Sequence, residues 1–133
     1  MHGGGNLGGA GSEDAFDGVN LAKQGVTVVT FNYRLGALGY LAHPELGCNF
    51  AVLDQVAALQ WVSNNIQCFG GDPNTVTLFG QSAGAMVVRT LLSVEHAQGL
   101  FHRAIIQSAG LEPYVFAKPL SYQKVCEVSS QFM

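Results

Sequence analysis

The stretch Gly80-Gln81-Ser82-Ala83-Gly84 constrains this chain more than any other part of its sequence. It follows an apolar run of β-forming residues, 75–79, and precedes a run of helix-forming residues, 83–92. A Gly-x-Ser-x-Gly motif between a strand and a helix predicts a nucleophile elbow, a sharp turn that exposes the serine hydroxyl above a sheet. Such a turn leaves no room for side chains two positions either side of the serine, so glycine is expected at both.

A second motif opens the chain, where His2 is followed by Gly3, Gly4 and Gly5. In serine hydrolases of the α/β type, a loop of this composition points backbone N–H groups at a developing oxyanion. Only a backbone without side chains approaches a substrate that closely, which explains the glycines. A flexible glycine-rich terminus is the alternative, because further glycines follow, but the elbow downstream favours the loop. Together the two motifs predict Ser82 as a nucleophile.

Further segments resemble the type B carboxylesterase family, the group that includes the cholinesterases. They are a strand-and-turn segment (32–41), a long helix (49–66), the segment around the elbow (69–85) and the following strand (101–110). The tail from 111 to 133 matches only loosely. The resemblance implies an α/β-hydrolase fold, in which helices flank a central, mostly parallel sheet. It also implies hydrolysis of a carboxylic ester through an acyl-serine intermediate, with no metal or organic cofactor.

The resemblance also implies roles for individual residues. Ser82 would attack the ester carbonyl, and the backbone N–H groups of Gly4, Gly5 and Ala83 would bind the oxyanion. Gly3 would be the hinge of the glycine loop. Gln81 stands where many family members carry glutamate, so this position keeps a hydrogen-bonding group but lacks the charge.

The catalytic acid and histidine are the main departure from the family pattern. In this fold they follow the serine in that order, but His96 and His102 come too soon after Ser82 to match the family histidine. The remaining acids after the serine are Glu95, Glu112 and Glu127. We therefore expect residues 1–133 to be a partial α/β-hydrolase domain, truncated at both ends and inactive alone. Two alternatives stay open: a non-catalytic, cholinesterase-like adhesion protein, which the intact elbow argues against, and a non-functional truncated product.

Composition agrees with this interpretation. Charged residues make up 11% of the chain and hydrophobic residues 48%, whereas a typical soluble domain has about 25% charged residues. We therefore expect a slice of a larger protein whose parallel strands are buried on both faces. A net charge of −3 without a basic cluster argues against nucleic acid, and no run approaches the roughly 18 apolar residues of a membrane span. The expected partner is a small ester; no leader peptide is visible, and localisation and oligomeric state stay open.

Apolar periodicity and turn residues predict alternating helices and strands, hence a parallel sheet. The expected helices are a segment capped by Ser12 and ending near Gly25, a segment stopped by Gly70, and the ranges 83–94 and 120–131; the expected strands are 26–33, 75–79 and 103–108.

Several single residues carry structural expectations. By resemblance, Arg34 and Asp54 form a buried salt bridge. Trp61, at helical spacing, is expected in the core, and His2 is expected to position the loop rather than act as a base. Free, buried thiols are the favoured interpretation of the cysteines, although pairing with cysteines elsewhere stays open; they are Cys48, Cys68 and Cys126.

Overall fold

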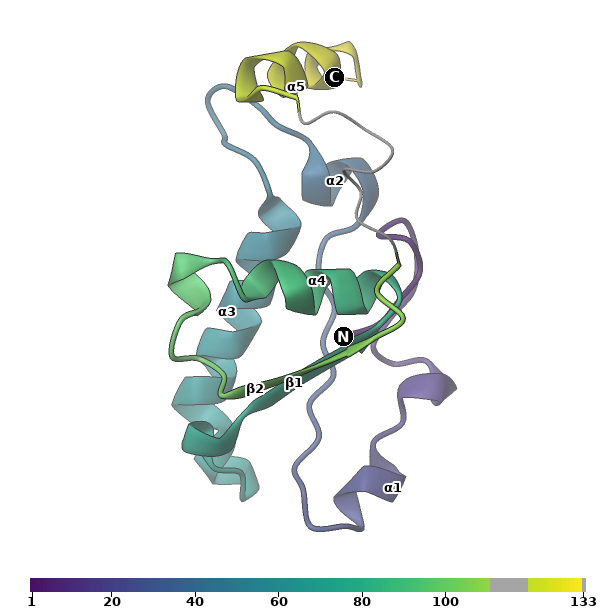
Figure 1. Cartoon of the computed structure of the whole chain (residues 1–133), viewed down its shortest axis with the longest axis vertical. Helices are drawn as coiled ribbons and strands as arrows, with labels where there is room; N and C mark the ends of the chain where they lie inside the picture. The colour runs from purple at the N-terminus through teal and green to yellow at the C-terminus, as the bar shows by residue number, and fades with distance from the viewer. Residues whose placement is uncertain (111–119, 133) are drawn as a thin grey trace.

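A computed structural model describes residues 1–110 and 120–132 of the chain (Figure 1). Its longer helices are α3, α4 and α5, and its two strands are β1 and β2. In chain order the elements are η1 (Asp14–Phe16), α1 (Val19–Ala22), α2 (Gly36–Tyr40), α3 (Phe50–Asn65), η2 (Ile66–Phe69), η3 (Pro73–Thr75), β1 (Thr77–Gln81), α4 (Ala83–Leu91), η4 (Glu95–Ala97), β2 (Arg103–Gln107), α5 (Tyr122–Ser129) and η6 (Ser130–Phe132).

The two strands and α4 form a β–α–β unit. β1 and β2 run parallel, with Thr77 opposite Arg103 and Gln81 opposite Gln107. Figure 1 shows α4 lying across both strands. Because the strands are parallel, their carboxyl ends meet at one edge, and open α/β sheets bind ligands at this edge. The sequence prediction of parallel strands joined by a helix is confirmed here. The end of β1, which leads into Ser82, therefore lies at that edge.

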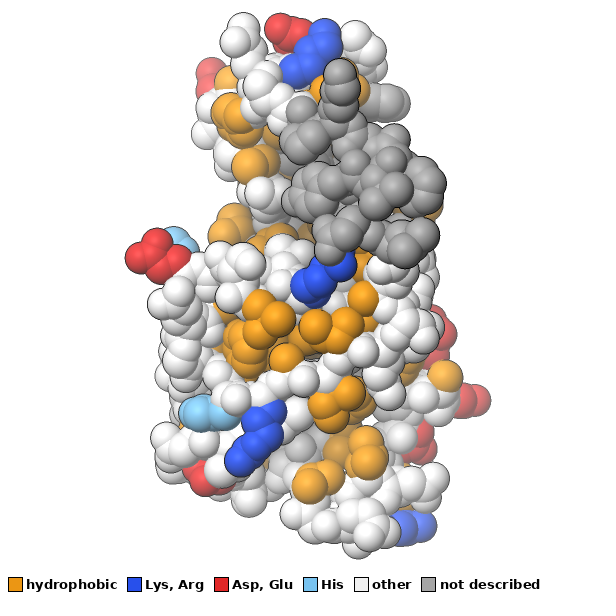
Figure 2. Space-filling view, in the orientation of Figure 1, with side chains coloured by type: hydrophobic (Ala, Val, Ile, Leu, Met, Phe, Trp, Pro, Cys, Tyr) orange, Lys and Arg blue, Asp and Glu red, His pale blue; other side chains and the backbone are white. Residues whose placement is uncertain are grey.

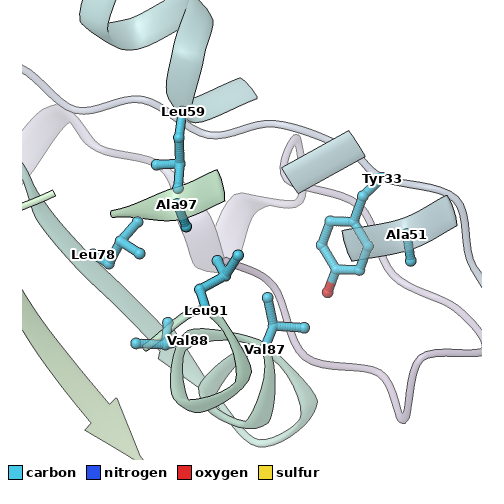
Figure 3. Packing of buried hydrophobic residues seen from close by; sticks show 8 residues of the cluster. All are labelled: Tyr33, Ala51, Leu59, Leu78, Val87, Val88, Leu91 and Ala97. Carbon is cyan, nitrogen blue, oxygen red and sulfur yellow. The ribbon is translucent and has the colours of Figure 1, made fainter. Parts of the chain in front are cut away.

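A small core lies where α3 and α4 meet over one face of β1. Leu78 projects from the strand into this core and is 5% exposed, while its neighbours Thr77 and Phe79 are exposed. Figure 3 shows the side chains that surround it, drawn from several elements: Leu59, Val87, Val88, Leu91 and Ala97, with Tyr33 and Ala51 at one side. β1 is therefore packed on one face only.

Two-sided burial of the strands is the expectation for a larger protein, and the part of the chain described leaves strand faces open, as expected for a slice of one. Every residue of β2 is exposed, with Ile105 at 51% and Ile106 at 40%. Figure 2 shows hydrophobic side chains gathered over the middle of one face of the molecule with few charged ones among them. Within residues 1–110 and 120–132 nothing covers the second face of the sheet. Buried and exposed residues therefore alternate along β1.

The run 26–33 has the composition of a strand but forms no ladder in the part of the chain described. A cavity of about 390 Å³ separates its residues 28–31 from 79–81 of β1. Paired strands lie only about 4.7–4.9 Å apart, so hydrogen bonds cannot cross such a gap. The segment is extended because its residues favour that backbone, but the prediction of a paired strand is wrong here.

The helix expected between Ser12 and Gly25 is broken into η1 and α1. Asp17 interrupts it, because its carboxylate Oδ1 accepts a hydrogen bond of 2.8 Å from the backbone N–H of Val19. Gly18 then packs against Val28, where an added Cβ would lie 2.6 Å from Val28 Cγ1. The predicted cap at Ser12 is wrong, since no side chain caps η1. The segment turns at Gly25 as expected, with φ of 85°.

Helix α3 is confirmed, but Trp61 lies outside its buried face. It continues through η2 to Gly70, whose φ of 78° ends it in the left-handed region. Trp61 is 47% exposed and its ring contacts that of Phe69 at a centroid distance of 5.7 Å. The prediction that Trp61 is a core residue is therefore wrong in the part described. The buried face holds Ala51, Gln55, Leu59, Val62 and, in η2, Ile66.

Helix α5 stands apart from the sheet at one end of the molecule (Figure 1). Ser121 caps it, since its hydroxyl accepts a hydrogen bond from the N–H of Lys124. The hydroxyl of Ser129 accepts a hydrogen bond of 3.1 Å from the N–H of Ala42, and Tyr122 donates one to the carbonyl of His43. These contacts dock α5 on the turn that follows α2, and the predicted C-terminal helix is confirmed.

All three cysteines are free in this structure, as expected, but only one is buried. Cys126 is buried on α5, Cys48 is half-buried and Cys68 is exposed in η2. The expectation of three buried thiols is therefore wrong for Cys68, because the outer side of η2 is open to solvent. Glu112, one of the acids considered, lies outside the described residues.

Candidate active site

Ser82 sits in a strained turn between β1 and α4. Its φ of 55° and ψ of −123° lie outside the regions that side chains favour. The backbone holds it on both sides: its N–H donates to the carbonyl of Gln107 at 2.9 Å, and its own carbonyl accepts from Ala85 and Met86. This is the geometry predicted for a nucleophile elbow.

The two glycines of the motif are required by close backbone contacts. A Cβ added at Gly80 would overlap the backbone of Gly84. A Cβ at Gly84 would lie 2.6 Å from the carbonyl oxygen of His2 and closer still to that of Met1. The sequence expectation that no side chain fits at either position is confirmed. The same contacts bring the start of the chain against the first turn of α4.

The glycine loop lies directly beside the elbow. A Cβ on Gly3 would be 3.3 Å from Cβ of Ser82. Gly4 and Gly5 have φ of 110° and 64°, values open to glycine at little cost. The carbonyl of Gly4 accepts hydrogen bonds from Leu7 and Gly8, which closes the turn. The fold thus brings together two motifs that are almost 80 residues apart in sequence. The amino group of Met1 donates a hydrogen bond of 2.7 Å to the carbonyl of Phe79, 78 residues further along the chain.

Several backbone N–H groups at this place have no acceptor in the part of the chain that the structure describes. They include the three expected donors, those of Gly4, Gly5 and Ala83. The N–H of Ala83 is free because the first turn of a helix has no intrahelical acceptor. The partial positive charge at a helix N-terminus also favours a negative oxygen there. Unused donors next to Ser82 are what an oxyanion site needs.

His2 is buried, with 2% of its surface exposed, and its ring contacts its own loop. Nδ1 lies 2.8 Å from the carbonyl oxygen of Gly3. A carbonyl can only accept, so Nδ1 carries the proton of this bond. The ring also stacks on Tyr33 at a centroid distance of 4.7 Å and an angle of 16°. This arrangement fits the predicted positioning role.

The segment 32–36 holds the glycine loop through contacts that sequence analysis missed. Tyr33 donates from its hydroxyl to the carbonyl of His2 at 3.0 Å. Asn32 accepts at Oδ1 from the N–H of Gly11 at 2.8 Å. The N–H of Gly36 donates to the carbonyl of Asn6 at 2.7 Å. The Asn-Tyr pair supported the family resemblance, but no spacing in the sequence indicates which loop it meets.

No histidine or acid reaches Ser82 in residues 1–110 and 120–132. The hydroxyl of Ser82 has no hydrogen bond to an imidazole or a carboxylate there. The N–H of His102 donates to the carbonyl of Val76, so His102 lies at the amino ends of the strands. Ser82 lies at the opposite, carboxyl ends, and a five-residue strand spans about 16 Å at roughly 3.3 Å per residue.

The other candidates are also placed elsewhere. His96 and Glu95 lie exposed in η4, which leads from α4 back to the amino end of β2. Glu127 pairs with Lys124 on α5 at 2.8 Å. The structure therefore brings together Ser82, Ala83 and the glycine loop, and leaves the histidines and acids after the serine apart from them.

Comparison with known proteins agrees with this geometry. The model of the carboxylesterase family matches residues 1–132. The chain belongs to the carboxylesterase family. The fumonisin B1 esterase of Sphingopyxis macrogoltabida is 49% identical over 91% of this chain. A solved structure of PNB esterase superposes with a TM-score of 0.84 at 42% identity, covering 99% of this chain and 28% of its own. The fold is therefore that of the α/β-hydrolases.

This carboxylesterase chain spans only about a quarter of the length of the curated relatives it matches, 23% of one and 27% of another. Not every relative carries an esterase name: neuroligin-2 of Mus musculus is 49% identical over 81% of the chain, which is 13% of that protein. In the part of the chain described, no helix is long and apolar enough to cross a membrane. The same residues hold no cluster of side chains suited to a metal ion.

Proposed function

We propose that the protein containing this chain hydrolyses carboxylic esters, with Ser82 as the nucleophile. The observation that carries the proposal is the strained Ser82 in a site whose unused N–H groups include those of Gly4, Gly5 and Ala83. Family membership and esterase relatives support the reaction class. The substrate is a small molecule with an ester bond.

The proposed reaction follows from the geometry. Ser82 Oγ attacks the carbonyl carbon, and the π electrons of the carbonyl move to its oxygen. The N–H groups of Gly4, Gly5 and Ala83 stabilise that oxyanion, an effect of about a hundred- to a thousandfold in rate per donor. When the carbonyl re-forms, the alcohol leaves and the acyl group remains on Ser82. Water then attacks this acyl-serine and releases the acid.

A histidine must take the proton of Ser82 and pass it to the leaving alcohol, then take a proton from the attacking water and return it to Ser82, and an acid must orient that histidine. We propose that both come from other parts of a longer polypeptide. The placement of His102 at the opposite end of the strands supports this, as does the greater length of the relatives. Glu95, His96 and Glu127 are then surface residues without a catalytic role.

The first experiment uses a fluorophosphonate probe on the full-length protein, with the modified serine located by mass spectrometry. Labelling of Ser82 and its loss in Ser82→Ala are expected, together with loss of ester turnover. Ser108→Ala is a matched control, because Ser108 also has a positive φ, of 53°, and directly follows the neighbouring strand β2. Labelling of a different serine, or full activity of Ser82→Ala, would contradict the assignment.

A second experiment uses the 133-residue chain alone with p-nitrophenyl acetate. We expect no turnover that depends on Ser82, because the proton acceptor is missing. A soluble monomer with Ser82-dependent turnover would show that His96 or His102 reaches the serine.

The rival function is that of a binding protein with the same fold and no chemistry. The match to neuroligin-2, which carries no esterase name, is the observation that favours this rival function. The probe separates the two: a binding protein leaves Ser82 unlabelled and turns over no ester, although it is folded.

A further inference from the structure

Tyr33 meets the glycine loop at the point where the loop begins. Its side chain is buried, at 6% exposure, and its ring lies against that of His2. Its hydroxyl donates a buried hydrogen bond of 3.0 Å to the carbonyl oxygen of His2. In Figure 3 the ring lies beside Ala51 at one side of the core cluster. Two kinds of contact, stacking and hydrogen bonding, therefore join one side chain to one loop residue.

The carbonyl that Tyr33 binds is confined from the other side as well. It lies so close to Gly84 that a Cβ there would be 2.6 Å from it. This carbonyl belongs to the peptide bond between His2 and Gly3, and a Cβ on Gly3 would lie 3.3 Å from Cβ of Ser82. The peptide plane is thus held between Tyr33 and the first turn of α4. Any rotation of that plane changes the direction in which the backbone enters Gly4 and Gly5.

The loop cannot hold this direction by itself. Gly3, Gly4 and Gly5 have no side chains that could pack, and glycine adopts many backbone conformations readily. Oxyanion stabilisation requires donors within about 2.7–3.1 Å of the developing charge. An external contact must therefore restrict the loop, and Tyr33 provides one at its first peptide unit.

We infer that Tyr33 is a positioning residue for the oxyanion site, acting through the carbonyl of His2. The inference rests on the proposed esterase function. Tyr33 touches neither the substrate nor Ser82. Its hydroxyl keeps the N–H groups of Gly4 and Gly5 where the transition state needs them, and substrate binding in the ground state does not depend on it.

The test compares Tyr33→Phe with Tyr40→Phe in the full-length protein. Tyr33→Phe keeps the stacked ring and removes only the hydroxyl, which leaves the carbonyl of His2 buried without its donor. Tyr40 is the matched control, because it is half-buried, packs against the same core and, among the described residues, has no hydrogen bond to the glycine loop. Activity is expressed per serine titrated to completion with the fluorophosphonate, so a smaller folded fraction does not enter the result.

For Tyr33→Phe we expect kcat to fall about ten- to a hundredfold, the range of a misplaced or weakened oxyanion donor, while KM changes by less than about twofold. The affinity for a trifluoromethyl ketone, which forms an oxyanion on Ser82, should fall by the same factor as kcat/KM. Tyr40→Phe should leave both unchanged.

A kcat of Tyr33→Phe equal to that of the wild type would overturn the inference, as would a rise in KM alone. A fall in kcat shared by Tyr40→Phe would also overturn it, because the effect would then be general. Ser82→Ala in the same assay separates this inference from the proposed function. If Ser82→Ala stays active, the function is wrong; if it is inactive and Tyr33→Phe is fully active, only the role of Tyr33 is wrong.

Discussion

The guanidinium of Arg34 donates two hydrogen bonds to the carboxylate of Asp54, from Nε to Oδ2 at 2.8 Å and from Nη2 to Oδ1 at 2.7 Å. The backbone N–H of Arg34 adds a third, to Oδ2, at 3.0 Å. The pair joins the segment before α2 to the first turns of α3. The pairing expected from the sequence is confirmed, but its burial is not, because the two side chains are 48% and 26% exposed.

This geometry predicts a pH-dependent contribution to stability. The hydrogen bond from Arg34 is the main cause that lowers the pKa of Asp54 below its ordinary value. A carboxyl with a lowered folded pKa stabilises the fold above its unfolded pKa, about 3.9, and this stabilisation is lost as the pH falls through the folded pKa. Asp54→Asn should therefore lower the melting temperature by a few degrees at pH 7, and by progressively less as the pH falls through the lowered folded pKa of Asp54. Exposure keeps the effect small.

The control for Asp54→Asn is Glu127→Gln, which breaks the exposed pair with Lys124 within α5. Melting temperatures of the three proteins across the pH range provide the measurement. A difference between wild type and Asp54→Asn that does not shrink as the pH falls below the ordinary range of a carboxyl would show that the ion pair is not its source.

Gly84→Ala should disrupt the contact between elbow and loop. The new methyl group would overlap the carbonyl oxygens of Met1 and His2, and overpacking of this kind costs about 1–3 kcal/mol. We expect a lower melting temperature and a rate of Ser82 labelling reduced at least tenfold, since the loop must move away. Gly8→Ala is the control in the same loop, because a Cβ at Gly8 meets nothing within 4 Å. Equal labelling of both variants would refute the proposed contact.

The hydroxyl of Tyr33 should remain protonated far into the alkaline range. Burial, together with the nearby Tyr40, raises its pKa to about 12. Because the folded pKa exceeds the unfolded value of about 10, the stabilisation is complete below pH 10 and is lost as the pH rises through about 12. Ultraviolet titration should show one tyrosine fewer ionising near pH 12 in Tyr33→Phe. A tyrosine lost from the transition near pH 10 instead would contradict the burial of this hydroxyl.

Thiol reactivity should follow exposure. Cys68 is exposed and Cys126 is buried, so a thiol reagent such as iodoacetamide should modify Cys68 first, by at least about tenfold in rate, and Cys126 only when α5 detaches. Peptide mapping after timed labelling measures both rates. Cys68→Ser should remove the fast phase and leave the slow one unchanged. A fast phase at Cys126 would mean that α5 does not stay docked on the turn after α2.

Short-range rules allowed the sequence to predict much of the site. Gly80 precedes Ser82 because the turn has no space for a Cβ there, and the backbone of Gly84 and Ala85 fills that space. The periodicity of α3 and the stop at Gly70 depend likewise on the nearest residues along the chain. These features follow from backbone sterics, which act within a few residues and are therefore visible in the sequence.

Tertiary structure alone decided which distant groups meet. The bond from Tyr33 to His2 and that from Ser82 to Gln107 join residues far apart in the chain, so no local pattern encodes them. The same holds for exposure: Trp61 and Ile105 are apolar, yet both face solvent in the part described. The run 26–33 is β-forming but lacks a ladder, because pairing needs a neighbour within hydrogen-bonding distance, and only the arrangement of the whole chain determines whether one is there.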